Sequence, residues 1–182
     1  MRTLGVDPGS VVTGYGVVDG VGQKLIHVSS GFLKVGKRPS FPERLSAIYQ
    51  GLTEIIDEHD PEVMAIESLF FSKNVKSAIL LGHARGVAIL AGVNAGLDIY
   101  EYSPLEIKQS VVGYGRADKG QVQEMIRILL SLKETPESNM ADALAVAVCH
   151  LNTARSIQRI HSNQHCRTLC GQQKPVKAPG SR

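Results

Sequence analysis

The sequence predicts an α/β fold with a five-stranded mixed sheet flanked by helices. Three β-rich runs follow one another near the start of the chain, and two later β-rich runs each follow a helix-like stretch. Strands in immediate succession favour an antiparallel meander, whereas a strand–helix–strand order implies a parallel crossover. At 182 residues, with 43% hydrophobic and 20% charged residues, the chain has the length and composition of one globular domain.

The first two predicted strands form a hairpin around a single carboxylate. The run LGVDPGSVVTGYGVV leads to Asp7, breaks at Pro8 and Gly9, and continues as a second apolar run in which Gly14 and Gly16 leave room for a close approach. A carboxylate at the end of a buried strand is costly unless it binds a cation or a donor. Because Asp before Pro-Gly is also ordinary turn chemistry, this stretch alone leaves both interpretations of Asp7 open.

A second carboxylate recurs at the end of a later strand. Lys24 to Val35 is predicted as a third strand, and an amphipathic helix with Ser40 as its N-cap leads into the strand Val63 to Glu67. The crossover places this fourth strand beside the first, so Asp7 and Glu67 fall at equivalent carboxyl ends of neighbouring strands. That coincidence favours a metal site over a turn residue.

A long helix is expected over Ser72 to Ala95, with small residues at a regular spacing. Ala78, Gly82 and Gly86 fall four residues apart and form a face that lets another helix approach closely, within the fold or across a dimer. The remaining predicted elements are a strand at Leu97 to Tyr102, a short helix from Pro104, a helix from Asp118 to Leu132 and an apolar helix from Ala143 to Leu151.

The start of the last helix supplies two further candidate ligands. Asn139 and Asp142 are three residues apart, so they share one face of the first helical turn. An acid at this position can complement the helix dipole. Within the run Met140-Ala-Asp-Ala-Leu-Ala, however, the acid faces an otherwise apolar wall, which also fits a site residue.

A glycine-rich loop between two of the helices carries cations. Lys108, Arg116 and Lys119 lie near Tyr114 in the sequence. Cations beside a flexible backbone and a stacking aromatic ring suit a nucleic-acid backbone. A solvated surface loop has the same composition, so the loop alone leaves both interpretations open.

The basic residues are unevenly distributed. Residues 1–154 hold 14 of the 20 Lys and Arg and all 17 acidic residues, whereas residues 155–182 hold the other six and no acid. A basic tail on an acidic body indicates a polyanionic partner, although many such tails are only solvated ends. We divide the chain into a domain of residues 1–153 and a basic, disordered C-terminal tail of residues 154–182.

The sequence predicts no membrane span, signal peptide, disulfide framework or zinc finger. No apolar run reaches the roughly 20 residues of a membrane span, and no signal peptide precedes the first strand, so we expect a cytoplasmic protein. Three cysteines are too few for a disulfide framework. The tail holds residue types that bind zinc, but their spacing matches no common zinc finger. They are His161, His165, Cys166 and Cys170.

The separated acids predict a site for hard divalent cations. Asp7, Glu67 and Asp142 offer oxygen ligands, with no histidine–serine or thiol arrangement predicted beside them. Two such ions about 4 Å apart can activate a water and stabilise the leaving oxygen of a phosphodiester. The metals also permit an anionic phosphate to enter a site that carboxylates alone would repel.

Four ordered motifs resemble the RuvC family of crossover (Holliday) junction endodeoxyribonucleases, within the ribonuclease H-like superfamily. They are GVDPGSVVTGYGVV, AIESLFFSKNVKSAILLGHARGVAI, PLEIKQSVVGYGRADKGQV and MADALAVAVCH, and the resemblance covers about residues 1–153. It implies a ribonuclease H-like sheet, a homodimer, and paired nicking of two like-polarity strands at a four-way junction. It also implies two Mg²⁺ ions, replaceable by Mn²⁺, and cooperation with RuvA–RuvB in recombinational repair.

The resemblance also implies roles for individual residues. Asp7, Glu67 and Asp142 match the metal ligands of the family, and Phe70 matches an aromatic residue that stacks near the crossover. Lys108 and Lys119 resemble its DNA-contacting cations. The further residues predicted to bind DNA are Arg116 and Lys73.

Asn139 departs from the family pattern, in which the residue three before Asp142 is usually Asp or His. An amide offers a carbonyl oxygen to a metal but adds no negative charge and accepts no proton at neutral pH. A junction-binding but cleavage-deficient protein is therefore an alternative. An actin-like nucleotide-binding fold would need a second half that this chain lacks, and a related nuclease acting on RNA is a third alternative.

Overall fold

The structure, a computed structural model, describes the backbone of residues 1–36, 38, 40–68 and 75–170, and the side chains of these residues up to 157. The elements and their bounds are β1 (Arg2–Asp7), β2 (Val12–Val21), β3 (Lys24–Lys34), α1 (Phe41–His59), β4 (Val63–Glu67), α2 (Val75–Asn94), β5 (Asp98–Tyr102), α3 (Pro104–Val112), α4 (Lys119–Leu129) and α5 (Ser138–Cys170).

The five strands form one mixed sheet in the order β3-β2-β1-β4-β5. The first three pair antiparallel as a meander, and β4 pairs parallel with both β1 and β5. The predicted fold class is therefore confirmed, including the crossover that brings β4 beside β1. Each parallel strand is reached through a helix, as the short connections of such a sheet require.

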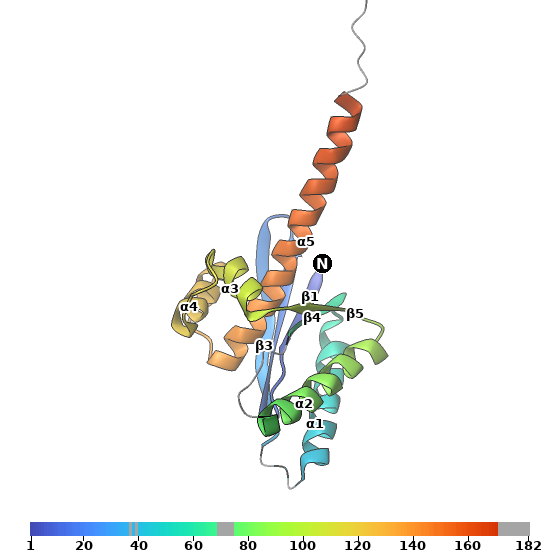
Figure 1. Cartoon of the computed structure of the whole chain (residues 1–182), viewed down its shortest axis with the longest axis vertical. Helices are drawn as coiled ribbons and strands as arrows, with labels where there is room; N and C mark the ends of the chain where they lie inside the picture. Colours follow the sequence, from blue (N-terminus) through green and yellow to red (C-terminus); the bar gives the residue numbers. More distant parts are fainter. Residues whose placement is uncertain (37, 39, 69–74, 171–182) are drawn as a thin grey trace, which may run out of the picture.

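Helices cover the two faces of the sheet in separate layers (Figure 1). One core lies under α1 and α2 and includes the fully buried Leu4 and Met64. The other lies under α3, α4 and α5 and includes Val18 and Leu144. Successive strand residues point to opposite faces, and β2, β3, β4 and β5 each contribute side chains to both cores.

Three helices begin at the residue types that satisfy free backbone N–H groups. Ser40, Ser103 and Asp118 each accept a hydrogen bond from the backbone three residues later, and that residue's side chain caps in return. The predicted N-cap Ser40 is therefore confirmed, and the helix predicted from Asp118 has this residue as its N-cap. The caps fix where α3 and α4 start, and these two helices carry the predicted DNA-binding lysines.

Helix α5 is longer than the sequence analysis predicted. The expected helix ended at Leu151, but α5 runs to Cys170 and projects beyond the sheet (Figure 1). The segment contains no proline or glycine before Gly171, so nothing in it interrupts the helix. The side chains of His161, His165, Cys166 and Cys170 lie outside the described residues. The division of the chain at residue 153 stays a prediction.

The expectation that no segment reaches membrane-spanning length is wrong for α2. Among the described residues, this 20-residue helix is long and apolar enough by length and composition to cross a bilayer. A search for uninterrupted apolar runs does not detect this helix, because Lys76, His83 and Arg85 divide it. Helix α2 packs along α1 and carries Arg85, which reaches the ends of two strands. Core helices of globular proteins pass the same test of length and composition.

Candidate active site

Two carboxylates lie side by side at the edge of the sheet that is formed by the carboxyl ends of its inner strands β1 and β4. Residues Val6 and Ile66 are register partners in the parallel pair β1–β4, so Asp7 and Glu67 end the two strands at equivalent positions. Gly5 and Ala65 face α5, and side chains alternate along a strand. Asp7 and Glu67 therefore project on the α5 face, as the sequence order predicted.

Glycines bring the start of α5 directly onto these strands. A Cβ atom at Gly14 would overlap the backbone oxygen of Asn139, and one at Gly5 would overlap that of Ala143. Gly14 is also the register partner of Asp7. The first turn of α5 consequently lies over Asp7, which brings Asn139 and Asp142 to the same edge of the sheet. The predicted role of Gly14 and Gly16 in close approach is thus confirmed.

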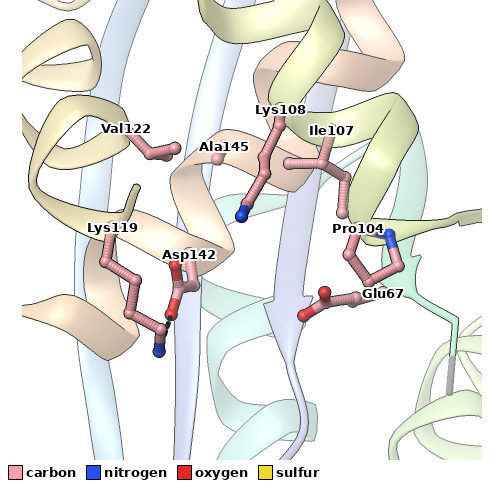
Figure 2. Close-up of a pocket in the computed structure, with 8 residues that line it drawn as sticks. All are labelled: Glu67, Pro104, Ile107, Lys108, Lys119, Val122, Asp142 and Ala145. Carbon is pink, nitrogen blue, oxygen red and sulfur yellow. Dashed lines mark ion pairs between the residues drawn. The ribbon is translucent and has the colours of Figure 1, made fainter. Parts of the chain in front are cut away.

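A pocket opens between this edge and the helices above it (Figure 2). Glu67 points into it from the end of β4, Asp142 from α5, and Lys108 from α3. Helix α4 adds Lys119, whose Nζ lies 3.6 Å from Oδ2 of Asp142. The lining residues are Glu67, Pro104, Ile107, Lys108, Lys119, Val122, Asp142 and Ala145.

Burial and mutual repulsion disfavour the charged forms of the carboxylates. Burial is the main cause that raises the pKa of Asp7 to about 6, and the Asp142 carboxylate adds to the shift. Burial likewise raises the pKa of Glu67 to about 7, with further contributions from Asp7 and Asp142. Lys119 opposes both shifts and Lys108 opposes that of Glu67, but neither cation cancels them. Glu67 is therefore only partly ionised at neutral pH in the metal-free site.

The donor set fits a hard divalent cation, although its ligands are not gathered into a closed shell. Within the part of the chain that the structure describes, no three His, Cys, Asp or Glu side chains lie close enough to hold one ion. Asp142 is instead engaged by Lys119 and by the hydroxyl of Ser138, which donates to its Oδ2 at 3.5 Å. Half-buried carboxylates with raised pKa values gain most from an added cation. Asp7, Glu67, Asp142 and the amide oxygen of Asn139 are the available donors.

One residue that holds the end of β4 was not predicted from the sequence. Arg85 on α2 donates from Nε to the backbone oxygen of Glu67 at 3.2 Å, and its Nη2 pairs with Glu101 on β5 at 2.5 Å. The amide of Ser68 also donates to the backbone oxygen of Tyr102. The detectable signal was an arginine within an otherwise apolar helix, because a buried cation needs a partner.

A comparison with protein-family models identifies the family of this chain. The model for the crossover junction endodeoxyribonuclease RuvC matches residues 3–150. The chain belongs to the RuvC family.

Individual RuvC proteins extend that match. The RuvC of Geotalea uraniireducens is 54% identical over 154 residues, which cover 85% of this chain and 90% of that protein. The structure of Thermus thermophilus RuvC in complex with a Holliday junction substrate superimposes with a TM-score of 0.81 at 35% identity, covering 86% of this chain and 96% of that one. A yeast mitochondrial Holliday junction resolvase shares the fold, with a TM-score of 0.65 at 14% identity over 92% of this chain and 86% of that one.

The structure brings some of the residues predicted from the RuvC resemblance to the site and leaves others outside it. Asp7, Glu67, Asn139 and Asp142 reach one edge of the sheet, and Lys108 and Lys119 line the pocket there. Arg116 is exposed on the loop before α4 and does not line the pocket. Phe70 and Lys73 lie outside the described residues.

Proposed function

We propose that this chain is an endonuclease that resolves four-way DNA junctions by hydrolysing phosphodiester bonds during recombination and repair. Membership of the RuvC family and the likeness to a RuvC–junction complex support this proposal. The single observation that carries it is the pairing of Asp7 and Glu67 on adjacent strand ends under the first turn of α5. An edge of this kind presents oxygen ligands and bound cations to a phosphate.

The proposed cofactor is Mg²⁺, two ions per site, with Mn²⁺ able to replace it. Asp7, Glu67 and Asp142 would hold the ions, and Asn139 would add an amide oxygen. When bound, the ions supply charge stabilisation and activation of water for the hydrolysis. The chain's own part is to bring these donors together and to release Asp142 from its ion pair with Lys119.

The lysines of the pocket fit a role in positioning the phosphate. Lys119 is 75% exposed, so its ammonium can exchange the Asp142 carboxylate for a phosphate oxygen without a change of fold. Lys108 extends from α3 into the same pocket (Figure 2). Arg116 and Lys73 are proposed to contact DNA farther from the reacting phosphate, and Phe70 to stack near the crossover.

We propose that α2 forms a homodimer. Four apolar residues that are half exposed or more, Val75, Ile79, Leu90 and Val93, lie on the same helix face as Gly86, at successive steps of four, seven, four and three residues. A Cβ added at Gly86 would meet nothing within 4 Å, so the small-residue face predicted from the sequence is open at this position in the single chain. The stripe comprises Val75, Ile79, Gly86, Leu90 and Val93. A dimer places two sites symmetrically on a symmetric junction.

Two further proposals rest on the family alone. We expect the protein to act in the cytoplasm and to cooperate with the RuvA–RuvB branch-migration complex. A localisation experiment tests the first expectation, and a binding experiment with RuvA and RuvB tests the second.

The alternative of a cleavage-deficient junction-binding protein depends on Asn139. The relatives that match over most of the chain are named as endodeoxyribonucleases, which does not favour this alternative. Asn139 also has an oxygen that can still serve as a neutral ligand. An active nuclease is therefore the better-supported function.

A labelled four-way junction incubated with Mg²⁺ tests the proposal. We expect symmetric nicks from the unchanged chain, none with EDTA, and none from linear duplex of the same sequence. Equal cutting of linear duplex and junction would contradict the junction-resolving function. Tight junction binding without nicks would instead support the cleavage-deficient alternative. Competition with structured RNA separates the DNA-specific enzyme from an RNA nuclease.

A further inference from the structure

The row of side chains that contains Asp7 runs across the strands to the outer strand β3, where it ends in an aromatic residue and a cation. Gly14 pairs with Asp7 on one side and with Phe32 on the other, and Lys34 is two residues beyond Phe32 on β3. Cross-strand partners project on the same face. Phe32 and Lys34 therefore lie on the α5 face, as Asp7 and Glu67 do.

The separation of this pair from the carboxylates follows from the strand spacing. Strands β1 and β3 are separated by β2 alone, so Phe32 lies about 10 Å from Asp7 along the row. Gly14 between them has no side chain, and the first turn of α5 occupies the space above it. A ligand that crosses the carboxylate pair in the direction of β3 next meets Asn139 and then the Phe32–Lys34 pair.

The chemistry of the pair suits a nucleotide. The Nζ of Lys34 lies 4.5 Å from the centroid of the Phe32 ring, and Lys34 is exposed at the surface. Within the described residues Lys34 has no ion-pair partner. An exposed cation–π contact is weak, so a phosphate oxygen can readily attract this ammonium. The ring is half-buried and offers an apolar surface to a sugar or base.

A DNA strand that passes the carboxylates toward β3 needs a cation on the β3 side of the site. Lys108 enters the pocket from α3, which follows β5, the outer strand on the side of the sheet opposite β3. On the β3 side the carboxylate row would repel a phosphodiester unless a cation lay beyond it. Lys34 occupies that position, and exposed Arg38 follows four residues later.

We propose that Phe32 and Lys34 form a second DNA-binding subsite, which holds a nucleotide of the cleaved strand beside the reacting phosphate. The subsite rests on the proposed function. Lys34 binds the phosphate and Phe32 supports the adjoining sugar or base. The strand would thereby be held on both sides of Asp7, by Lys108 toward β5 and by Lys34 toward β3.

Lys24 provides a matched control for Lys34. It is an exposed lysine at the opposite end of the same strand, ten residues away, which is roughly 34 Å in a strand. Its backbone oxygen accepts a hydrogen bond from Arg155, and replacing the side chain leaves that oxygen in place. Lys24→Ala and Lys34→Ala thus remove the same charge from the same strand, far from the site and near it.

The experiment measures junction binding as a function of KCl in an Asp7→Asn background, which keeps the DNA uncut. We expect Lys34→Ala to weaken binding about three- to tenfold near 0.1 M salt and to reduce the slope of log K against log [KCl] by about one. Lys34→Arg should retain both values. Lys24→Ala should change the affinity less than about twofold and leave the slope unchanged.

A second measurement addresses Phe32. Phe32→Leu keeps an apolar side chain but removes the ring, and we expect a loss of binding of about fivefold, the lower end for aromatic–base stacking. A 2-aminopurine base placed beside the cut should be quenched by the protein with Phe32 and quenched less by the F32L variant. Melting curves of all variants should agree within a few degrees.

The outcomes separate the subsite from the function on which it rests. If Lys34→Ala and Lys24→Ala have equal affinity and equal salt slopes, the pair is a surface contact and the subsite is wrong. If the Asp7→Asn parent prefers linear duplex to the junction, the proposed function is wrong, whatever the lysine variants do. A reduced slope for Lys34→Ala alone supports the subsite.

Discussion

Strand β1 carries a charged residue at each end, and the surroundings of the two ends are opposite. At its start, Arg2 contacts Asp19 through two hydrogen bonds of 2.9 and 3.0 Å and donates a third to the backbone oxygen of His59. At its end, Asp7 lies beside Glu67 and under α5, where the neighbouring carboxylates repel it. One end therefore has its charges paired within the fold, and the other holds charges that need a partner from outside.

The pKa values follow this contrast. The hydrogen bond from Arg2 is the main cause that lowers the pKa of Asp19, so its charged form stabilises the fold above the normal carboxyl range and this contribution disappears as the pH falls. The pKa of Asp7 rises to about 6 and that of Glu67 to about 7. Their ionisation therefore destabilises the metal-free fold as the pH rises through these values. A charge that costs stability in this way is typical of a functional site, which supports the proposed metal site at this end of the strand, called the functional end below.

The largest expected effect separates the two ends directly. Asp7→Asn should reduce junction cleavage on the order of 10³-fold, because it removes a charged metal ligand, and should leave junction binding nearly unchanged. Asp19→Asn, the matched change on β2, should leave cleavage within about twofold. Single-turnover rates with a labelled junction at saturating Mg²⁺ measure both. Persistent cleavage by Asp7→Asn would remove Asp7 from the metal site.

Asn139 tests how much negative charge the functional end needs. We expect Asn139→Asp to raise cleavage about 10²-fold, the scale of regaining a general base or a charged ligand, and Asn139→His to act in the same direction. The first turn of α5 tolerates both changes because residue 139 is half-buried rather than enclosed. Equal rates for the three proteins at saturating Mg²⁺ would show that the amide oxygen suffices.

The sequence order was enough to predict the adjacent carboxylates, but not the contacts around them. Asp7 and Glu67 could be paired because a crossover helix forces β4 beside β1. The position of Asn139 and Asp142 needed the glycine contacts with α5, which Gly14 and Gly16 only indicated. The Lys119–Asp142 pair joins α4 to α5 and the Arg85–Glu67 contact joins α2 to β4, and both depend on how these successive elements pack rather than on a local sequence pattern.

A smaller effect is expected from the paired end of β1. Arg2→Ala removes the two hydrogen bonds to Asp19 and the one to His59, which join β1, β2 and the end of α1. We expect a fall in melting temperature of about 2–4 °C and no change in the cleavage rate per folded molecule. Circular dichroism and the junction assay measure the two quantities. A loss of cleavage without a loss of stability would mean that this end is not purely structural.

The smallest expected effect is a pH-dependent gain of stability at the functional end. Glu67→Gln replaces a carboxylate whose pKa is raised to about 7 by an uncharged group of the same shape. Near pH 4 both proteins are neutral at this position in the folded state, so their melting temperatures should agree. Above pH 7 the wild type must bury a charge that the E67Q variant does not carry.

The variant should therefore melt about 1–3 °C above the wild type at pH 8 without metal. Added Mg²⁺ should close that gap, because the ion stabilises the charged carboxylates of the wild type and gains less from the amide. The paired end supplies the control, since Asp19→Asn should lower the melting temperature at pH 8 with or without Mg²⁺. If Glu67→Gln destabilised the metal-free protein at pH 8, the carboxylate would already have its partner within the fold. The contrast between the two ends of β1 would then be lost.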